Sequence, residues 1–185
     1  MSDAAQPRRA EETGVMDPFP HMHPILKKNY GNWKWHDRLR PGVLHHVSKD
    51  GDEVWTVRAG TQRQMDVHTI RKLCDVADEF ADGHVRFTTR SNAEFMVGAE
   101  ETVAPLIERL ENDGFPVGGT GNSVSMISHT QGWLHCDIPG TDASGVVKSL
   151  MDELHHEFTH EEMPNRVRIT TSCCQINCGG QGDIA

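Results

Sequence analysis

The sequence predicts an α+β protein whose first folded part is a ferredoxin-like half-domain with the element order β-α-β-β-α. Two observations predict this class: strands and helices follow one another in that order after Asp50, and both helices carry a single apolar stripe. A third observation extends the prediction. After a glycine-rich turn, a further strand, helix and strand lead into a run of cysteines. We therefore expect the start of a second α+β domain behind the half-domain.

The half-domain begins with a predicted strand at Glu53–Arg58, a run rich in β-branched and aromatic residues. Asp66 is a good N-cap for a helix that runs to about Ala81, and Gly83 follows as a stop signal. The apolar face expected for this helix is Val67, Ile70, Leu73, Cys74, Ala77 and Phe80.

Two strands and a helix complete the predicted half-domain. Val85–Thr89 and Ala93–Val97 are short β-type runs joined by a turn at Arg90–Asn92. Glu100–Asn112 has a helical pattern that ends at Gly114. Its inward residues should be Val103, Leu106, Ile107 and Leu110.

The second region starts after the glycine-rich segment 116–122, which lacks the following helix that a phosphate-binding loop needs. Val124–Ser128 is a predicted strand. Thr141 or Asp142 should begin a helix that reaches about Phe158. Its apolar stripe is Val146, Val147, Leu150, Leu154 and Phe158. Arg166–Thr171 should then be a strand that delivers the cysteine run.

These boundaries predict three parts: residues 1–48, 49–120 and 121–185. The first contains a charged arm to about Pro20 and then an aromatic-rich extension, which has no obvious core and should pack on another subunit or domain. A stacking platform for single-stranded nucleic acid is the alternative for this extension. The third part stops just after the cysteines, where a cluster-binding loop would normally be covered on both sides, so we expect the chain to be a fragment.

Composition excludes several classes of function. A formal net charge of −9 and the lack of a basic stripe argue against nucleic-acid binding. No run approaches the ~18 apolar residues of a membrane span, and the polar start is not a signal peptide. The absence of an export signal favours the reducing cytoplasm. Most of the twelve histidines are scattered and should lie on the surface.

The cysteines are the strongest chemical signal. Cys173, Cys174 and Cys178 lie within six residues, and Cys136 lies upstream. Three thiols so close together cannot satisfy one another as disulfides. Their spacing favours an iron–sulfur cluster, whose ligands sit on separate irons, over tetrahedral zinc; buried or redox-active thiols remain a further alternative. Gly179 and Gly180 would let the backbone approach the cluster closely.

Cys74 is a different case, because it falls in the apolar pattern of the first predicted helix and should be a core residue.

Arginines stand near the ends of several predicted strands: Arg58, Arg63, Arg86, Arg90, Arg166 and Arg168. Any one of them could simply form a surface ion pair. Taken together they suggest a convergent guanidinium patch, because Arg166 and Arg168 are two residues apart and leave the same face of a strand. Such a patch suits a polyanion, for example a tetrapyrrole with several carboxylates, or an oxyanion substrate.

These motifs resemble the beta subunits of dissimilatory sulfite reductase, a family of sirohaem enzymes, from about residue 20 to the C-terminus. The matching segments are Asn29–Trp35, Pro41–Leu44, Arg86–Arg90, Glu94–Val97, Pro116–Gly121, His129–Cys136 and the run from Cys173 to Cys178. Family members continue beyond this end and complete the sirohaem/[4Fe-4S] domain, of which residues 121–185 would be the first part. The assimilatory sulfite and nitrite reductases are a related alternative, but their C-x5-C and C-x3-C pattern does not fit.

The resemblance implies an oxidoreductase that carries out the six-electron reduction of sulfite to sulfide, or the reverse. It implies that Cys136, Cys173, Cys174 and Cys178 ligate a [4Fe-4S] cluster and that Cys178 also bridges to the sirohaem iron. An alpha subunit, in a heterotetramer of two alpha and two beta chains, and a small sulfur-carrier protein are the implied partners.

By position, Arg58, Arg90, Arg166 and Arg168 resemble residues that bind the tetrapyrrole carboxylates or the anion, facing the ring associated with the alpha subunit. No residue of this chain is thereby identified as catalytic with certainty. Two other classes of function stay open: an electron-transfer or scaffold module with a cluster but no sirohaem, and a zinc-stabilised binding domain.

Overall fold

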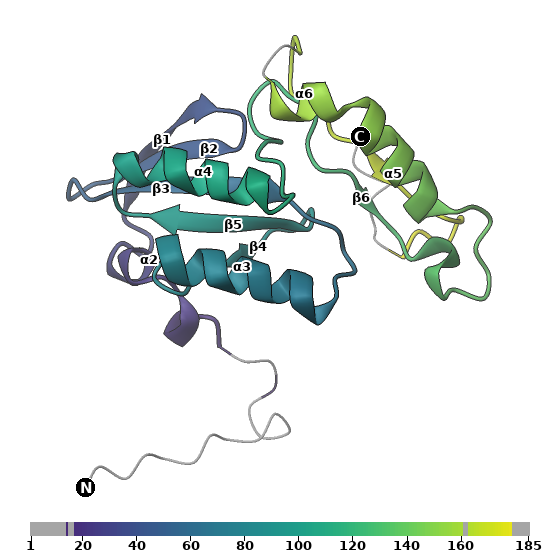
Figure 1. Ribbon diagram of the computed structural model, residues 1–185, viewed down its shortest axis with the longest axis horizontal. Helices are drawn as coiled ribbons and strands as arrows, with labels where there is room; N and C mark the ends of the chain where they lie inside the picture. The colour runs from purple at the N-terminus through teal and green to yellow at the C-terminus, as the bar shows by residue number, and fades with distance from the viewer. Residues whose placement is uncertain (1–13, 15–16, 161–162, 179–185) are drawn as a thin grey trace, which may run out of the picture.

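A five-stranded sheet forms the first part of the computed structural model, which describes residues 14, 17–160 and 163–178 (Figure 1). The strands lie in the order β1-β2-β3-β5-β4, and every neighbouring pair is antiparallel. Their bounds are β1 (Trp33–Arg40), β2 (Val43–Ser48), β3 (Glu53–Gly60), β4 (Arg86–Phe87) and β5 (Asn92–Val97). The predicted α+β class is confirmed.

Helices α3 (Val67–Phe80) and α4 (Val103–Asn112) lie over one face of this sheet, as Figure 1 shows. Asp66 caps α3 as predicted, because its carboxylate accepts a hydrogen bond of 2.7 Å from the Thr69 amide. A short 3-10 turn, η2 (Glu100–Thr102), precedes α4. The four inward residues predicted for α4 are all buried.

The core fills the space between the sheet and these two helices. Burying a large aliphatic or aromatic side chain contributes about 1.5–3 kcal/mol each, so this cluster accounts for most of the stability of the half-domain. Strand alternation places Val57 and Phe95 in this core and turns Arg58 and Glu94 to the opposite face. The core is therefore what fixes where the charged side chains of β3 and β5 point.

Cys74 is not part of this core, contrary to the prediction. It is exposed on α3, together with Val67 and Ile70, and the buried face of the helix is Leu73, Val76 and Ala77. The apolar stripe read from the sequence is wider than the contact with the sheet, so its outer edge faces solvent.

Strands β1 and β2 come from the aromatic extension, for which the sequence analysis gave no strands. β2 pairs with β3 over Val43–Val47, beside the first strand of the half-domain. The segment after α4 pairs only at the far end of β3, where the Gly60 amide donates to the Pro116 carbonyl over 2.8 Å. β1 is the outer strand and is exposed on both faces, so the partial alternation of Trp33, Trp35 and Leu39 with polar residues does not mark a buried face.

Residues 17–29 pack beside the end of α3 through His23. This segment holds η1 (Phe19–His21) and α2 (Pro24–Lys28). The His23 Nδ1 atom accepts a hydrogen bond from the Ile25 amide over 3.3 Å, and Nε2 lies 3.5 Å from an Asp82 carboxylate oxygen. His23 is buried, so it is both the cap of α2 and its anchor on the half-domain.

The second region consists of helices packed along a two-stranded parallel sheet. Its elements are β6 (Ser128–His129), η3 (Gly132–Leu134), α5 (Ala143–Glu153), α6 (His155–Thr159) and β7 (Thr170–Thr171). The single predicted helix is broken at Leu154, whose backbone leaves the helical conformation. The predicted strands at 124–128 and 166–171 are reduced to β6, β7 and one bridge between Val124 and Val167.

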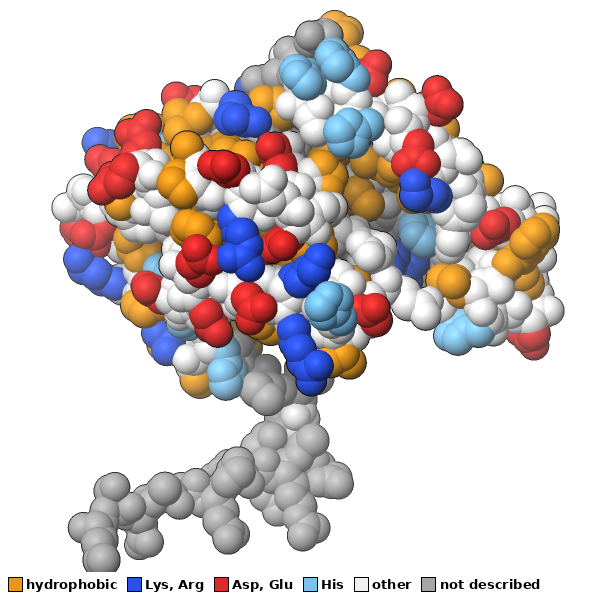
Figure 2. Space-filling view, in the orientation of Figure 1, with side chains coloured by type: hydrophobic (Ala, Val, Ile, Leu, Met, Phe, Trp, Pro, Cys, Tyr) orange, Lys and Arg blue, Asp and Glu red, His pale blue; other side chains and the backbone are white. Residues whose placement is uncertain are grey.

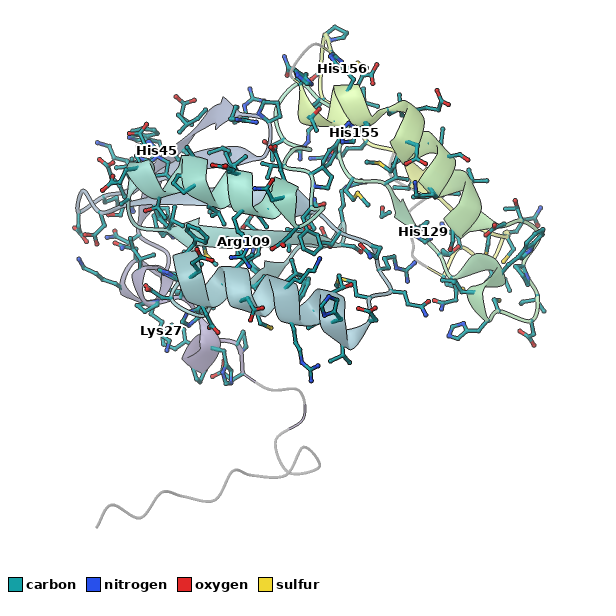
Figure 3. All side chains as sticks on the ribbon, in the orientation of Figure 1. Lys27, His45, Arg109, His129, His155 and His156 are labelled. Atoms are coloured by element: carbon teal, nitrogen blue, oxygen red, sulfur yellow. The ribbon has the colours of Figure 1, made fainter. Side chains whose placement is uncertain are left out.

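Charges are mixed over the face shown in Figure 2, where acidic and basic side chains alternate across α3 and α4. Histidines are spread widely: His155 and His156 lie on α6, away from His45 and His129 (Figure 3). Across the described ranges, no helix combines the length and the apolar composition that crossing a membrane requires.

The glycine-rich turn joins the two regions by packing against Phe158, a fully buried side chain of α6. The Gly119 amide donates to the Phe158 carbonyl over 2.9 Å. A Cβ at Gly118 would lie less than 3.0 Å from that same carbonyl oxygen, and Gly119 has a φ of +76°, which favours glycine. The turn can therefore approach α6 only as bare backbone.

Replacing Gly118 with alanine is expected to destabilise the chain by about 1–3 kcal/mol, because the new Cβ meets backbone that cannot move aside. The urea unfolding midpoint measures this loss. Gly98→Ala is the matched control, since a Cβ at Gly98 meets nothing within 4 Å. Equal midpoints for the two variants would contradict the packing argument.

Acidification is expected to loosen α2 from the half-domain. The pKa of His23 is lowered, mainly because the side chain is buried. The Asp82 carboxylate opposes this effect, and the His84 imidazole adds to it. Above the ordinary value of about 6.5, both docked and detached forms are neutral and docking is complete. As the pH falls through this value the detached form takes up the proton more readily, so docking weakens.

Amide hydrogen exchange at Ile25–Asn29, measured at about pH 7.5 and about pH 5.5, tests this expectation. Protection should fall at the lower pH in the native chain and should lose that dependence in His23→Gln. An unchanged pH dependence in the variant would assign the effect to another group.

Candidate functional site

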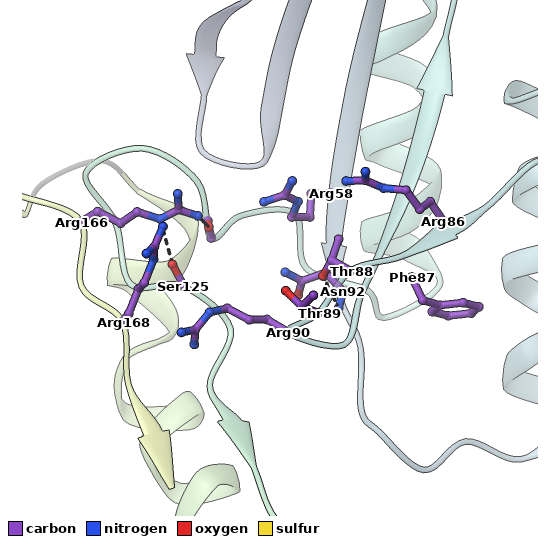
Figure 4. Close-up of a pocket in the computed structure, with 11 residues that line it drawn as sticks. Arg58, Arg86, Phe87, Thr88, Thr89, Arg90, Asn92, Ser125, Arg166 and Arg168 are labelled. Carbon is purple, nitrogen blue, oxygen red and sulfur yellow. Dashed lines mark hydrogen bonds between the residues drawn. The ribbon is translucent and has the colours of Figure 1, made fainter. Parts of the chain in front are cut away.

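Five arginines surround one cavity between the half-domain and the second region. The cavity has a volume of about 540 Å³ and is called the arginine cavity below. Figure 4 shows Arg58, Arg86 and Arg90 reaching it from the half-domain side and Arg166 and Arg168 from the other. The remaining lining residues are Phe87, Thr88, Thr89, Asn92, Gly119 and Ser125. The expected convergence of guanidinium groups is thus present in the fold.

On the half-domain side, two arginines share one carboxylate. Glu94 is only 3% exposed; its Oε2 accepts from Nε and Nη2 of Arg58 over 2.9 and 2.5 Å. Its Oε1 lies 2.6 Å from Arg86 Nη2. These two cationic side chains are therefore held in place by a single buried anion.

On the other side, Arg166 has neutral partners. Arg166 donates from Nε to the Ser125 hydroxyl over 3.1 Å and from Nη2 to the Gly119 carbonyl over 3.4 Å. Arg168 follows two residues later on the same segment and lines the same cavity, as strand alternation predicts. In the part of the chain that the structure describes, no hydrogen-bond acceptor or carboxylate pairs with Arg168.

Arg90 links the half-domain to the second region. From the turn between β4 and β5, its Nη1 donates to the carbonyls of Met126 and Ile169 over 3.2 and 3.1 Å. These two carbonyls belong to the segments that lead into β6 and out toward β7. Arg90 therefore lines the cavity and also ties its two walls together.

The arginine cavity carries uncompensated positive charge. Burial lowers the pKa of Arg90, and Arg168 lowers it further. Burial likewise lowers the pKa of Arg166, and Arg168, Arg58 and Arg90 add to the effect. A bound anion would relieve this repulsion and accept several N–H bonds at once, which is the chemistry of a multivalent carboxylate or an oxyanion.

The cysteine run begins where β7 ends. Cys173 is buried; its amide donates to the Thr130 hydroxyl over 2.8 Å, and its carbonyl accepts from Gly140 over 2.8 Å and from Thr141 over 3.1 Å. The Thr130 side chain also hydrogen-bonds the thiol and lowers the pKa of Cys173, with further help from the Gly132 amide. The site therefore favours the thiolate form that soft metals and clusters bind.

Two of the other cysteines, Cys136 and Cys174, lie close to Cys173. Cys136 sits in the loop between Gly132 and Gly140, both ends of which contact Cys173, and Cys174 hydrogen-bonds the Cys173 thiol. No disulfide links any of the five cysteines. Gly179 and Gly180, expected to approach a cluster, lie outside the described residues.

Cys178 lines a separate cavity of about 290 Å³, which also contains Arg63 and His129. Thr89 borders both this cavity and the arginine cavity, so the two adjoin. Among residues 17–160 and 163–178, no three Cys, His, Asp or Glu side chains surround a common point that one metal ion could occupy. The described structure therefore does not gather Cys136, Cys173, Cys174 and Cys178 around one metal ion, and their role as cluster ligands stays a prediction.

The structure removes Arg63 from the predicted guanidinium patch and gives Glu94 a role that was not predicted. Arg63 donates to the His129 carbonyl and does not line the arginine cavity. Glu94 was read only as part of a strand. Its signal was an acidic residue in the middle of an otherwise apolar strand, a position that calls for a charged partner.

Comparison with known proteins gives a family model, the nitrite/sulfite reductase ferredoxin-like half domain, that matches residues 46–113. The chain is 46% identical over 191 residues to the dissimilatory-type sulfite reductase subunit beta of Megalodesulfovibrio gigas, covering 97% of this chain and 73% of that protein. The subunit from Nitratidesulfovibrio vulgaris is 50% identical over 163 residues, and that from Archaeoglobus fulgidus 46% over 173 residues. The chain spans only 43% and 47% of those two relatives.

Solved structures support the fold. The crystal structure of dissimilatory sulfite reductase I (DsrI) matches with a TM-score of 0.74 at 16% identity, over 84% of this chain and 40% of that one. The NirA protein of Mycobacterium tuberculosis matches with a TM-score of 0.56 at 14% identity, over 66% and 23%.

The half-domain match, the shared fold and above all the close sequence identity agree with the family expected from the motifs. This chain belongs to the beta subunits of dissimilatory-type sulfite reductase.

Proposed function

We propose that this chain acts in a sulfite reductase that converts sulfite to sulfide by six electrons, or runs the reverse reaction. The observation that carries the proposal is the arginine cavity, in which five guanidinium groups from two regions face one space. A multi-carboxylate tetrapyrrole such as sirohaem suits this space, because each carboxylate can accept two parallel N–H bonds from one arginine. Arg58, Arg90, Arg166 and Arg168 are the proposed binding residues.

We assign the second cofactor, a [4Fe-4S] cluster, to Cys136, Cys173, Cys174 and Cys178, with Cys178 also bridging to a sirohaem. When bound, the pair supplies an iron that activates sulfur and a store of electrons beside it. The chain's own part is to keep thiolates available, which the Thr130 and Gly132 hydrogen bonds to Cys173 support. Arginines near the ring would attract the sulfite anion and orient its oxygens.

None of the five cysteines lines the arginine cavity, although all five lie in the described part of the chain. This supports the division implied by the family, in which the arginines face the ring associated with the alpha subunit and the cysteines serve the other ring. An alpha subunit, in a complex of two alpha and two beta chains, is therefore the proposed partner. A small sulfur-carrier protein is the second proposed partner. Free thiols suit a reducing compartment such as the cytoplasm.

Alanine in place of Cys136, Cys173, Cys174 or Cys178 is expected to remove most of the non-haem iron and acid-labile sulfide from the assembled enzyme. Each change deletes one thiolate ligand of the proposed cluster. Iron and sulfide analysis per beta chain, after anaerobic purification, measures the loss.

Cys74→Ala is the matched control and should keep full iron content, because Cys74 is exposed on α3, away from the cysteine run. Cys178→Ala should in addition abolish the electronic coupling between cluster and haem. A full complement of iron and sulfide in any of the four variants would remove that residue from the ligand set.

Arg168→Gln is expected to weaken binding of uroporphyrin, a tetrapyrrole with eight carboxylates, by roughly tenfold, since a charge-assisted hydrogen bond contributes about 1.5–3 kcal/mol. Quenching of the porphyrin fluorescence on titration with the chain gives the dissociation constant. Arg71→Gln removes the same charge from the exposed surface of α3 and should change it little. Equal losses in both variants would indicate non-specific attraction.

A further inference from the structure

Glu94 occupies an unusual place beside the arginine cavity. It is a buried carboxylate on β5, the strand between β3 and β4. Arg58 on β3 and Arg86 on β4 are both its direct cross-strand partners. Each carboxylate oxygen is bound by a different arginine, so one anion fixes two cations that belong to different strands.

We propose that Glu94 is a positioning residue that holds Arg58 and Arg86 as a preformed pair for the carboxylates of a bound tetrapyrrole. The proposal rests on the function proposed above and assigns a role to a residue that does not itself line the cavity. Arg86 has a side chain that is 56% exposed, so without Glu94 it is free to turn into solvent. Arg58 is more enclosed, at 17%, and would keep its place but lose its orientation.

The two walls of the cavity differ in this respect. Arg166 is held by a hydroxyl and a carbonyl, which leave its full charge available, whereas Arg58 and Arg86 share one negative charge. On the half-domain wall, Glu94 therefore fixes the positions of Arg58 and Arg86, whereas Arg166 on the opposite wall keeps its whole charge for a ligand. An anion with several separated carboxylates can use both.

A purely electrostatic role and a positioning role for Glu94 predict opposite changes in anion affinity when Glu94 is removed. If Glu94 acted only through its charge, removing it would make the cavity more positive and tighten anion binding. If it positions the two arginines, removing it weakens binding, because guanidinium groups that are not held must be ordered when the ligand arrives. The direction of the change therefore decides between the two roles.

The test is titration of the chain with uroporphyrin. Glu94→Gln is expected to weaken binding about tenfold, as the loss of one well-oriented arginine contact would. Glu108→Gln, an exposed residue of α4, removes the same negative charge away from the cavity and should not weaken binding. Tighter or unchanged binding by Glu94→Gln would overturn the proposal.

Glu94→Asp provides a second test if the glutamine variant does not fold. It keeps the charge and draws the carboxylate back by one methylene, so a positioning role predicts weaker binding and a charge role predicts no change. Arg86→Gln completes a double-mutant cycle: with Glu94→Gln or Glu94→Asp, the combined loss should be much smaller than the product of the single losses. Losses that simply multiply would show that Glu94 does not act through Arg86.

Failure of the native chain to bind uroporphyrin would count against the proposed function itself. The same variants are then titrated with pyrophosphate, a compact anion with several negative charges. Weaker binding in the Glu94 variants would support the positioning role without a tetrapyrrole, and equal binding would overturn it.

Discussion

The packing of Phe158 against bare glycine backbone is the contact on which the rest of this molecule depends. The half-domain and the second region meet where Gly118 and Gly119 lie against that ring and its carbonyl. Arg90 adds a polar link at the same junction by donating to two carbonyls of the second region. Because the arginine cavity lies between these regions, its shape exists only while this junction holds.

Much of the half-domain could be predicted from the sequence, because each of its two helices has a strong cap or stop and one apolar stripe. Asp66 and the glycines after each helix marked the ends correctly. Strands β1 and β2 could not be predicted in the same way. β1 is the outermost strand and is exposed on both faces, so burial imposes no alternation on its sequence. The prediction for Cys74 was wrong because the apolar pattern of a helix shows which residues are apolar. It does not show how much of that face the sheet covers.

The candidate site was predictable to the extent that its residues were close in sequence or ended a strand. The cysteines and the pair Arg166 and Arg168 belong to this class, and strand alternation explains why both arginines face one cavity. Glu94 was missed because its importance comes from two partners on neighbouring strands, which only sheet register reveals. The contacts of Cys173 with Thr130 and Gly132 were likewise invisible, since 40 or so residues separate them in sequence and the parallel pairing of β6 with β7 joins them.

Among the described residues, no strand pairs with the outer edge of β1, and such an edge is the kind of surface on which chains pair with copies of themselves and aggregate. Its sequence counters that tendency in two ways. Lys34, Asp37, Arg38 and Arg40 place charges along the strand, and irregular register near both of its ends disturbs the flat edge that another strand would need. Trp35 and Leu39 of β1 can thus remain exposed to solvent without drawing copies of the chain together.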